Sequence, residues 1–117
     1  MIPSINTGIG KGRFPRIPLE WPVILLTPQD SIFGETRDIS VSGALILCPY
    51  KFEANDKFQI LLTPPTYDVM PITCEKAWSG DFYSNLFLYD AIGVRFTKIS
   101  SSDSQIIASK VAEYYPI

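Results

Sequence analysis

The sequence has 117 residues, 46% of them hydrophobic, which suits one domain with a single core and is too apolar for a disordered chain. Its formal net charge of −2 argues against a general binder of DNA or RNA. It contains no histidine, which removes the commonest general base and every pairing of histidine with a serine or cysteine nucleophile, so we expect no enzyme.

The N-terminal segment concentrates the basic charge. Lys11, Arg13 and Arg16 are the only charged residues before Glu20, and the rest of the chain is acidic on balance. Residues 1–15 also combine Gly, Pro, Ser and Asn, so we predict a flexible arm over 1–15 and a domain over 16–117, with a local anion site. No signal sequence opens the chain and the longest apolar runs are strand-sized, which predicts a cytoplasmic protein without membrane contact.

From Leu19 onward, short runs rich in β-branched and aromatic residues alternate with turn residues. Five or six strands are predicted, at 20–26, 31–39, 44–47, 57–62, 71–78 and 91–96. This spacing is typical of an all-β sandwich or small barrel.

Cys48 and Cys74 each lie within an apolar run, so we expect buried, reduced thiols; a disulfide would require an oxidising compartment. Two cysteines without histidine cannot complete a structural zinc site.

One helix is predicted at the C-terminus. Ser102 is the expected N-cap, and Gln105 three residues later completes a capping box. The apolar residues that follow are expected on one face: Ile106, Ile107, Ala108, Val111 and Tyr114. Such a face packs against the sheet or closes one end of a barrel, and the alternative is a helix that docks a partner.

Three short motifs stand in order along the chain. Residues 12–18 read GRFPRIP, residues 38–43 read DISVSG and residues 92–96 read IGVRF. They resemble the signatures of the PilZ domain family, which are RxxxR, (D/N)xSxxG and a GVxF strand before a final helix. The resemblance covers roughly residues 11–115 and implies a six-stranded antiparallel β-barrel with a C-terminal helix. It also implies that cyclic di-GMP binds between the barrel face and the N-terminal arm. The first motif is incomplete, because Gly12 stands where its first arginine belongs.

The resemblance implies a set of ligand-binding residues: Lys11, Arg13, Arg16, Asp38, Ser40, Gly43 and Trp78. Arginine can pair bidentately with a guanine edge or a phosphate, and a carboxylate can accept from the guanine N1–H and amino group. A simpler interpretation also stays open. Asp38, Ser40 and Gly43 would then only form a β-turn, the arginines would be solvated, and Trp78 would be an aromatic residue of the core or barrel rim.

Two functions are therefore compatible with the sequence. The first is a bacterial regulatory domain that binds cyclic di-GMP, weakly if Gly12 removes one contact, and relays the signal to a protein partner. The second is an adaptor that no longer binds nucleotide and acts only through proteins. Residues 81–89 favour the second, because DFYSNLFLY places many large apolar side chains in a predicted loop. Neither function requires a metal or a resident cofactor.

Overall fold

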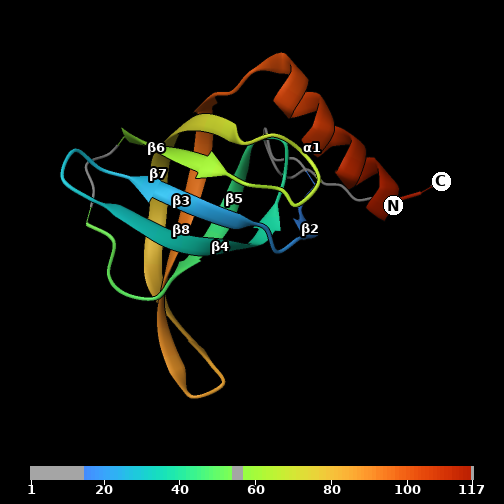
Figure 1. Ribbon diagram of the computed structural model, residues 1–117. Helices are drawn as coiled ribbons and strands as arrows, with labels where there is room; N and C mark the ends of the chain where they lie inside the picture. The colour runs from blue at the N-terminus through green and yellow to red at the C-terminus, as the bar shows by residue number, and fades with distance from the viewer. Residues whose placement is uncertain (1–14, 54–56, 117) are drawn as a thin grey trace.

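The computed structural model describes residues 15–53 and 57–116, which form an antiparallel barrel and one helix (Figure 1). The elements in chain order are β2 (Ile17–Pro18), β3 (Pro22–Leu26), β4 (Ser31–Ile39), β5 (Gly43–Cys48), β6 (Lys57–Leu62), β7 (Met70–Ser84), β8 (Phe87–Lys98) and α1 (Ser101–Tyr114). Hydrogen bonding links the strands in the order β2-β4-β3-β6-β7-β8-β5, and β5 pairs again with β4. That last pairing closes a barrel of six strands, which confirms the predicted fold class.

Alternating side chains fill the interior of the barrel. Val23 and Leu25 of β3 are fully buried, as are Ile60 and Leu62 of β6, and the residues between them are more exposed. This period of two is what a strand with one face in the core requires. The two cysteines also point inward and are buried and unpaired, as expected. Burial raises the pKa of both thiols to about 12, and the nearby Asp90 carboxylate contributes at Cys48.

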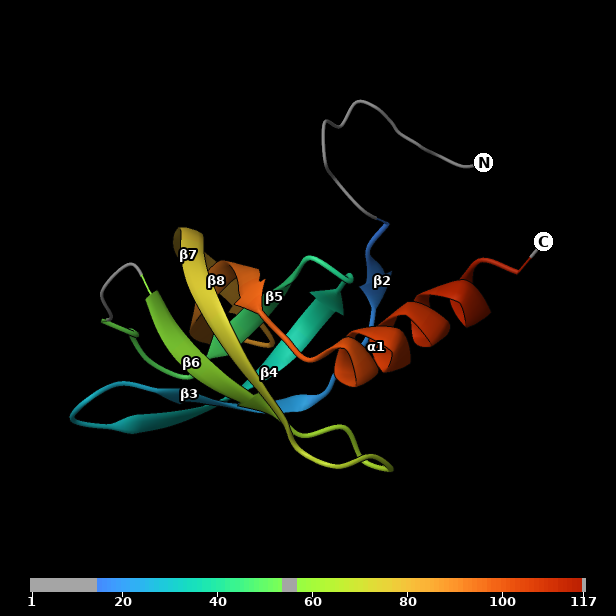
Figure 2. The ribbon, with the colours of Figure 1, turned by 90° about the horizontal axis from the view of Figure 1, so that it is seen from above.

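Helix α1 lies beside one end of the barrel (Figure 2). Its N-cap is Ser100, whose Oγ accepts a hydrogen bond from the backbone N–H of Asp103 at 3.1 Å, so the predicted cap at Ser102 was wrong. Four serines precede Gln105 in the local sequence, and only the backbone conformation decides which one caps. Ile107 is fully buried, but Tyr114 is 53% exposed because the last turn extends past the barrel. Within the described ranges, no helix has the length and apolar character needed to cross a membrane.

The predicted loop at residues 81–89 is instead the end of a long hairpin formed by β7 and β8, which projects from the barrel (Figure 1). Ser84 pairs with Phe87, and the two residues between them, Asn85 and Leu86, have φ of 50° and 70°. Two positive φ angles in a two-residue connection are typical of the type I′ hairpin turn. The strands therefore continue well beyond the predicted ends at positions 78 and 91.

Candidate functional site

One row of residues crosses four strands on the outer face of the barrel. Asp38 of β4 pairs with Leu45 of β5, Leu45 pairs with Gly93 of β8, and Gly93 pairs with Trp78 of β7. Residues that stand directly opposite each other in a sheet share one face. Asp38 and Trp78, which are distant in the sequence, therefore stand at the two ends of a single row.

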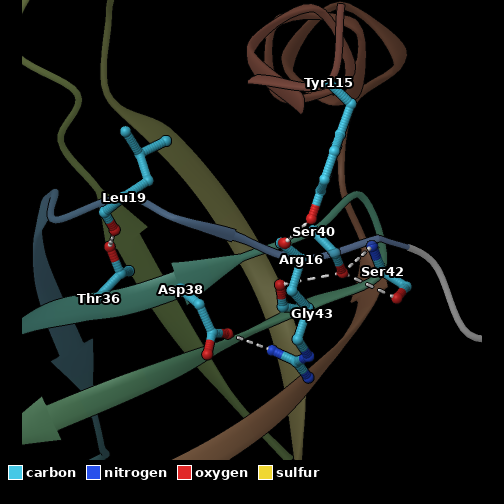
Figure 3. A network of polar contacts seen from close by, with 8 residues as sticks. All are labelled: Arg16, Leu19, Thr36, Asp38, Ser40, Ser42, Gly43 and Tyr115. Atoms are coloured by element: carbon cyan, nitrogen blue, oxygen red, sulfur yellow. Dashed lines mark hydrogen bonds and ion pairs between the residues drawn. The ribbon is translucent and has the colours of Figure 1, made fainter. Parts of the chain in front are cut away.

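Arg16 joins this row through an ion pair with Asp38. The two strand pairs between β2 and β4, at Ile17 with Ile39 and Pro18 with Asp38, bring Arg16 beside the carboxylate. Its Nη1 nitrogen lies 2.5 Å from Oδ1 of Asp38, and the side chains are 47% and 30% exposed (Figure 3). The hydroxyl of Tyr115 donates to the backbone carbonyl of Arg16 at 2.9 Å, so the end of α1 also fixes this residue. The ion pair is held in place and remains accessible from solvent.

Thr36 fixes the segment that follows β2. Its side chain is fully buried, and its hydroxyl donates to the carbonyl of Leu19 and accepts from the backbone N–H of Trp21, the latter at 2.9 Å. The backbone N–H of Leu19 donates to the carbonyl of Arg37 at 3.3 Å. These bonds hold the chain against β4 directly after Arg16, and Figure 3 shows the one between Thr36 and Leu19.

Ser40 lies in the turn between β4 and β5, and Gly43 is the first residue of β5. Ser40 is 1% exposed, and its Oγ accepts from the backbone N–H of Ser42 at 3.1 Å. The backbone N–H of Ser40 donates to the carbonyl of Gly43 at 2.8 Å. A Cβ atom at position 43 would lie 2.2 Å from the carbonyl oxygen of Val94, so only glycine fits this approach of β8. The DISVSG motif thus uses these two residues to build a turn, and it presents the Asp38 carboxylate on the outer face.

Trp78 lies flat against the barrel wall. Its Nε1 is 2.6 Å from the position of a Cβ at Gly93, and its Cζ3 is 3.3 Å from that of a Cβ at Gly80. The two glycines therefore make room for the ring, a role that neither glycine reveals in the sequence. Trp78 is nevertheless 53% exposed, so its indole can stack on a planar ligand.

Of the seven residues predicted to bind ligand, the structure brings Arg16, Asp38 and Trp78 onto one outer face. Lys11 and Arg13 lie outside the described residues, as does Gly12. The part of the chain that is described holds no group of three or more histidine, cysteine, aspartate or glutamate side chains able to hold a metal ion. The chemistry of this face is that of a guanidinium, a carboxylate and an aromatic ring.

Comparisons with known proteins agree with this architecture. The family model for the PilZ domain matches residues 11–113. Among solved structures, the chain is similar to the Bacillus subtilis inhibitor of motility (MotI/DgrA), with a TM-score of 0.76, 12% identity, and coverage of 92% of this chain and 52% of that one. It therefore spans about half the length of that protein.

A second solved structure is the PilZ domain of YcgR from Escherichia coli with cyclic di-GMP. Its TM-score is 0.70 at 13% identity, and the match covers 86% of this chain and 88% of that one. At such low identities, these likenesses establish the fold. No curated protein matches the sequence significantly.

Proposed function

We propose that this chain, which belongs to the PilZ domain family, is a bacterial cytoplasmic regulator that binds cyclic di-GMP on the outer face of its barrel and acts through a protein partner. PilZ domains are regulatory receptor or adaptor domains that bind cyclic di-GMP and often protein partners. The observation that carries the proposal is the convergence of Arg16, Asp38 and Trp78 on one face.

Each of these groups suits one part of the ligand, which has two phosphodiester charges and two guanines. Arg16 offers a planar fork for a phosphate or for the O6 and N7 atoms of guanine. Asp38 can accept hydrogen bonds from the guanine N1–H and amino group, and Trp78 can stack on a base. In the structure Arg16 and Asp38 pair with each other. Because such exposed ion pairs contribute about 0–1 kcal/mol, a ligand can replace this one at little cost.

The proposal divides the chain into an arm at residues 1–15 and a barrel domain at residues 16–117. Lys11 and Arg13 on the arm would approach the anionic ligand from the side of Arg16, and Gly12 would leave one arginine contact unmade. A bidentate contact contributes roughly 1–3 kcal/mol, or about 5- to 150-fold in affinity. We therefore propose weak binding, with Ser40 and Gly43 acting through the turn that they build.

Isothermal titration calorimetry of the purified chain with cyclic di-GMP tests this function. Arg16→Ala and Asp38→Asn should each weaken binding about fivefold or more. Lys57→Ala is a suitable control, since it removes an exposed cation from β6, which pairs with neither β4 nor β5, and should leave affinity unchanged. Gly12→Arg should raise affinity by the factor given above. A titration without heat at high micromolar ligand would refute nucleotide binding.

The hairpin favours a second candidate function, an adaptor that binds proteins without nucleotide. Tyr83, Phe87 and Leu88 on the hairpin are 74%, 65% and 50% exposed, and Leu86 is fully exposed. Large apolar side chains gathered at the surface are typical of interfaces. A photo-crosslinking residue at position 86 should then capture one specific protein in cells, and the same residue at position 57 should not. Specific capture combined with a flat calorimetric titration would favour this function over the first.

A further inference from the structure

Arg37 reaches across the outer face of the barrel. It belongs to β4, whereas Phe82 belongs to β7, and on this face β5 and β8 lie between those strands. The guanidinium carbon of Arg37 is nevertheless 5.2 Å from the centroid of the Phe82 ring. Strand pairing places Leu47 and Ala91 on the outer face between β4 and β7. Ala91 is only 2% exposed, which is consistent with cover by side chains lying over the face.

A β-bulge explains why Arg37 points outward next to Asp38. The register of β4 against β5 shifts between Thr36 and Asp38. Thr36 and Ile39 are both fully buried, so the two residues between them share the outer face. Strict alternation in a strand would place neighbouring residues on opposite faces, and a bulge removes this constraint. The bulge thus puts a second guanidinium beside the site formed by Arg16 and Asp38.

The donors of Arg37 are only weakly engaged. Among the residues that the structure describes, its ion pair is with Glu20 at 3.8 Å, with side chains 44% and 61% exposed. That separation exceeds hydrogen-bond length, in contrast to the 2.5 Å between Arg16 and Asp38. The contact with Phe82 is a cation–π contact and not a conventional hydrogen bond, which leaves N–H donors of Arg37 for a ligand.

We propose that Arg37 is a specificity-determining residue, which pairs with the O6 and N7 edge of a guanine stacked on Trp78. The inference rests on the proposed function and supplies the guanidinium that is missing at Gly12. Trp78, Gly80 and Phe82 alternate along β7 and therefore share the face of Arg37. The indole of Trp78 extends along the strand towards Gly80, which is also the direction of Phe82. Four residues of a strand span about 13 Å, so the proposed contact requires the indole, a purine stacked on it and the long Arg37 side chain to bridge this distance together.

Calorimetry with two ligands, cyclic di-GMP and cyclic di-AMP, tests this role. Adenine has no O6 acceptor, so loss of Arg37 should reduce the preference for guanine as well as the affinity. Arg37→Gln should weaken cyclic di-GMP binding about 5- to 150-fold and lower the ratio of the two affinities. Arg37→Lys, which keeps the charge without the fork, should lower the same ratio. The matched control is Arg95→Gln, because Arg95 is an exposed outer-face arginine engaged by Glu75, and it should preserve the ratio.

Three outcomes would overturn the assignment. If Arg37→Gln kept the wild-type affinity and base preference, the contact would be excluded. If Arg95→Gln lost as much affinity and base preference as Arg37→Gln, the effect would come from the net charge of the face and not from a specific contact of Arg37. A wild-type chain that gives no heat with cyclic di-GMP would refute the proposed function together with this inference. The first two outcomes, obtained with a wild-type chain that does bind, would refute the inference alone.

Discussion

Replacing Gly93 with alanine should move Trp78 off the barrel wall. The three atoms nearest to a Cβ at position 93 all belong to this indole, with Nε1 at 2.6 Å, Cδ1 at 2.9 Å and Cε2 at 3.2 Å. Real Cβ atoms essentially never make contacts under 3.0 Å, so the ring must shift. No backbone atom is among the three, and the strand pairing of residue 93 with Leu45 can therefore persist.

Two opposing contributions set the change in the free energy of unfolding. Alanine is favoured over glycine within a strand by roughly 0.5–1 kcal/mol, because glycine loses more conformational freedom on folding. Trp78 is 53% exposed, so about half of its surface, on the order of 100 Å², is buried in the wild-type protein. At about 25 cal/mol per Å² this burial stabilises by at most about 2.5 kcal/mol. A displaced ring keeps part of its contacts, and we expect a net loss of about 1 kcal/mol.

A double-mutant cycle separates the two contributions. Urea unfolding followed by far-UV circular dichroism gives the free energy of unfolding for the wild type, Gly93→Ala, Trp78→Ala and the double variant. Once the indole is removed, the same glycine-to-alanine change should stabilise the protein by roughly 0.5–1 kcal/mol. The effect of the substitution should therefore change sign between the two backgrounds. Equal destabilisation in both would show that the indole is not the reason for glycine at this position.

Three further predictions concern stability in urea unfolding. Thr36→Val removes the partner of one buried backbone N–H, that of Trp21, and of one partly buried carbonyl, that of Leu19, and should cost about 1–3 kcal/mol; an unchanged midpoint would contradict the network around Thr36. Ser100→Ala should cost about 1 kcal/mol and Ser102→Ala much less, whereas the reverse order would restore the cap predicted at Ser102. Because burial raises the pKa of the Cys48 and Cys74 thiols from 9.0 to about 12, the unfolded state loses these protons first as pH rises. Stability should fall between pH 9 and 12, and an equally steep fall in Cys74→Ala would exclude that thiol as a cause.

The barrel strands could be predicted because each has one buried face. Alternation in residues 31–39 and 57–62 gives strand bounds that agree with the structure at both ends. The hairpin could not be predicted in the same way, since Tyr83 and Phe87 occupy opposite faces and are both exposed, so no alternation marks a core side. Its turn is also hidden, because Leu86 at a φ of 70° replaces the glycine that usually identifies such a connection.

In the candidate site, too, some residues could be predicted from the sequence and others depend on how the strands pair. Arg16 and Asp38 belong to motifs that are visible in the sequence, and the structure pairs them. Gly93 could not be matched to Trp78, because their contact depends on the register between β7 and β8. Arg37 was missed since its outward direction comes from a bulge, and a one-residue shift of register appears only once two strands are paired.

The contact between Arg37 and Phe82 limits how far the ligand site can control the hairpin. An exposed cation–π contact contributes about 0.5–1 kcal/mol. A ligand that draws Arg37 away from Phe82 can therefore shift an equilibrium between two positions of the hairpin by only about two- to fivefold. A ligand shifts an equilibrium no further than its difference in affinity for the two states. A larger response to cyclic di-GMP would therefore require a second connection.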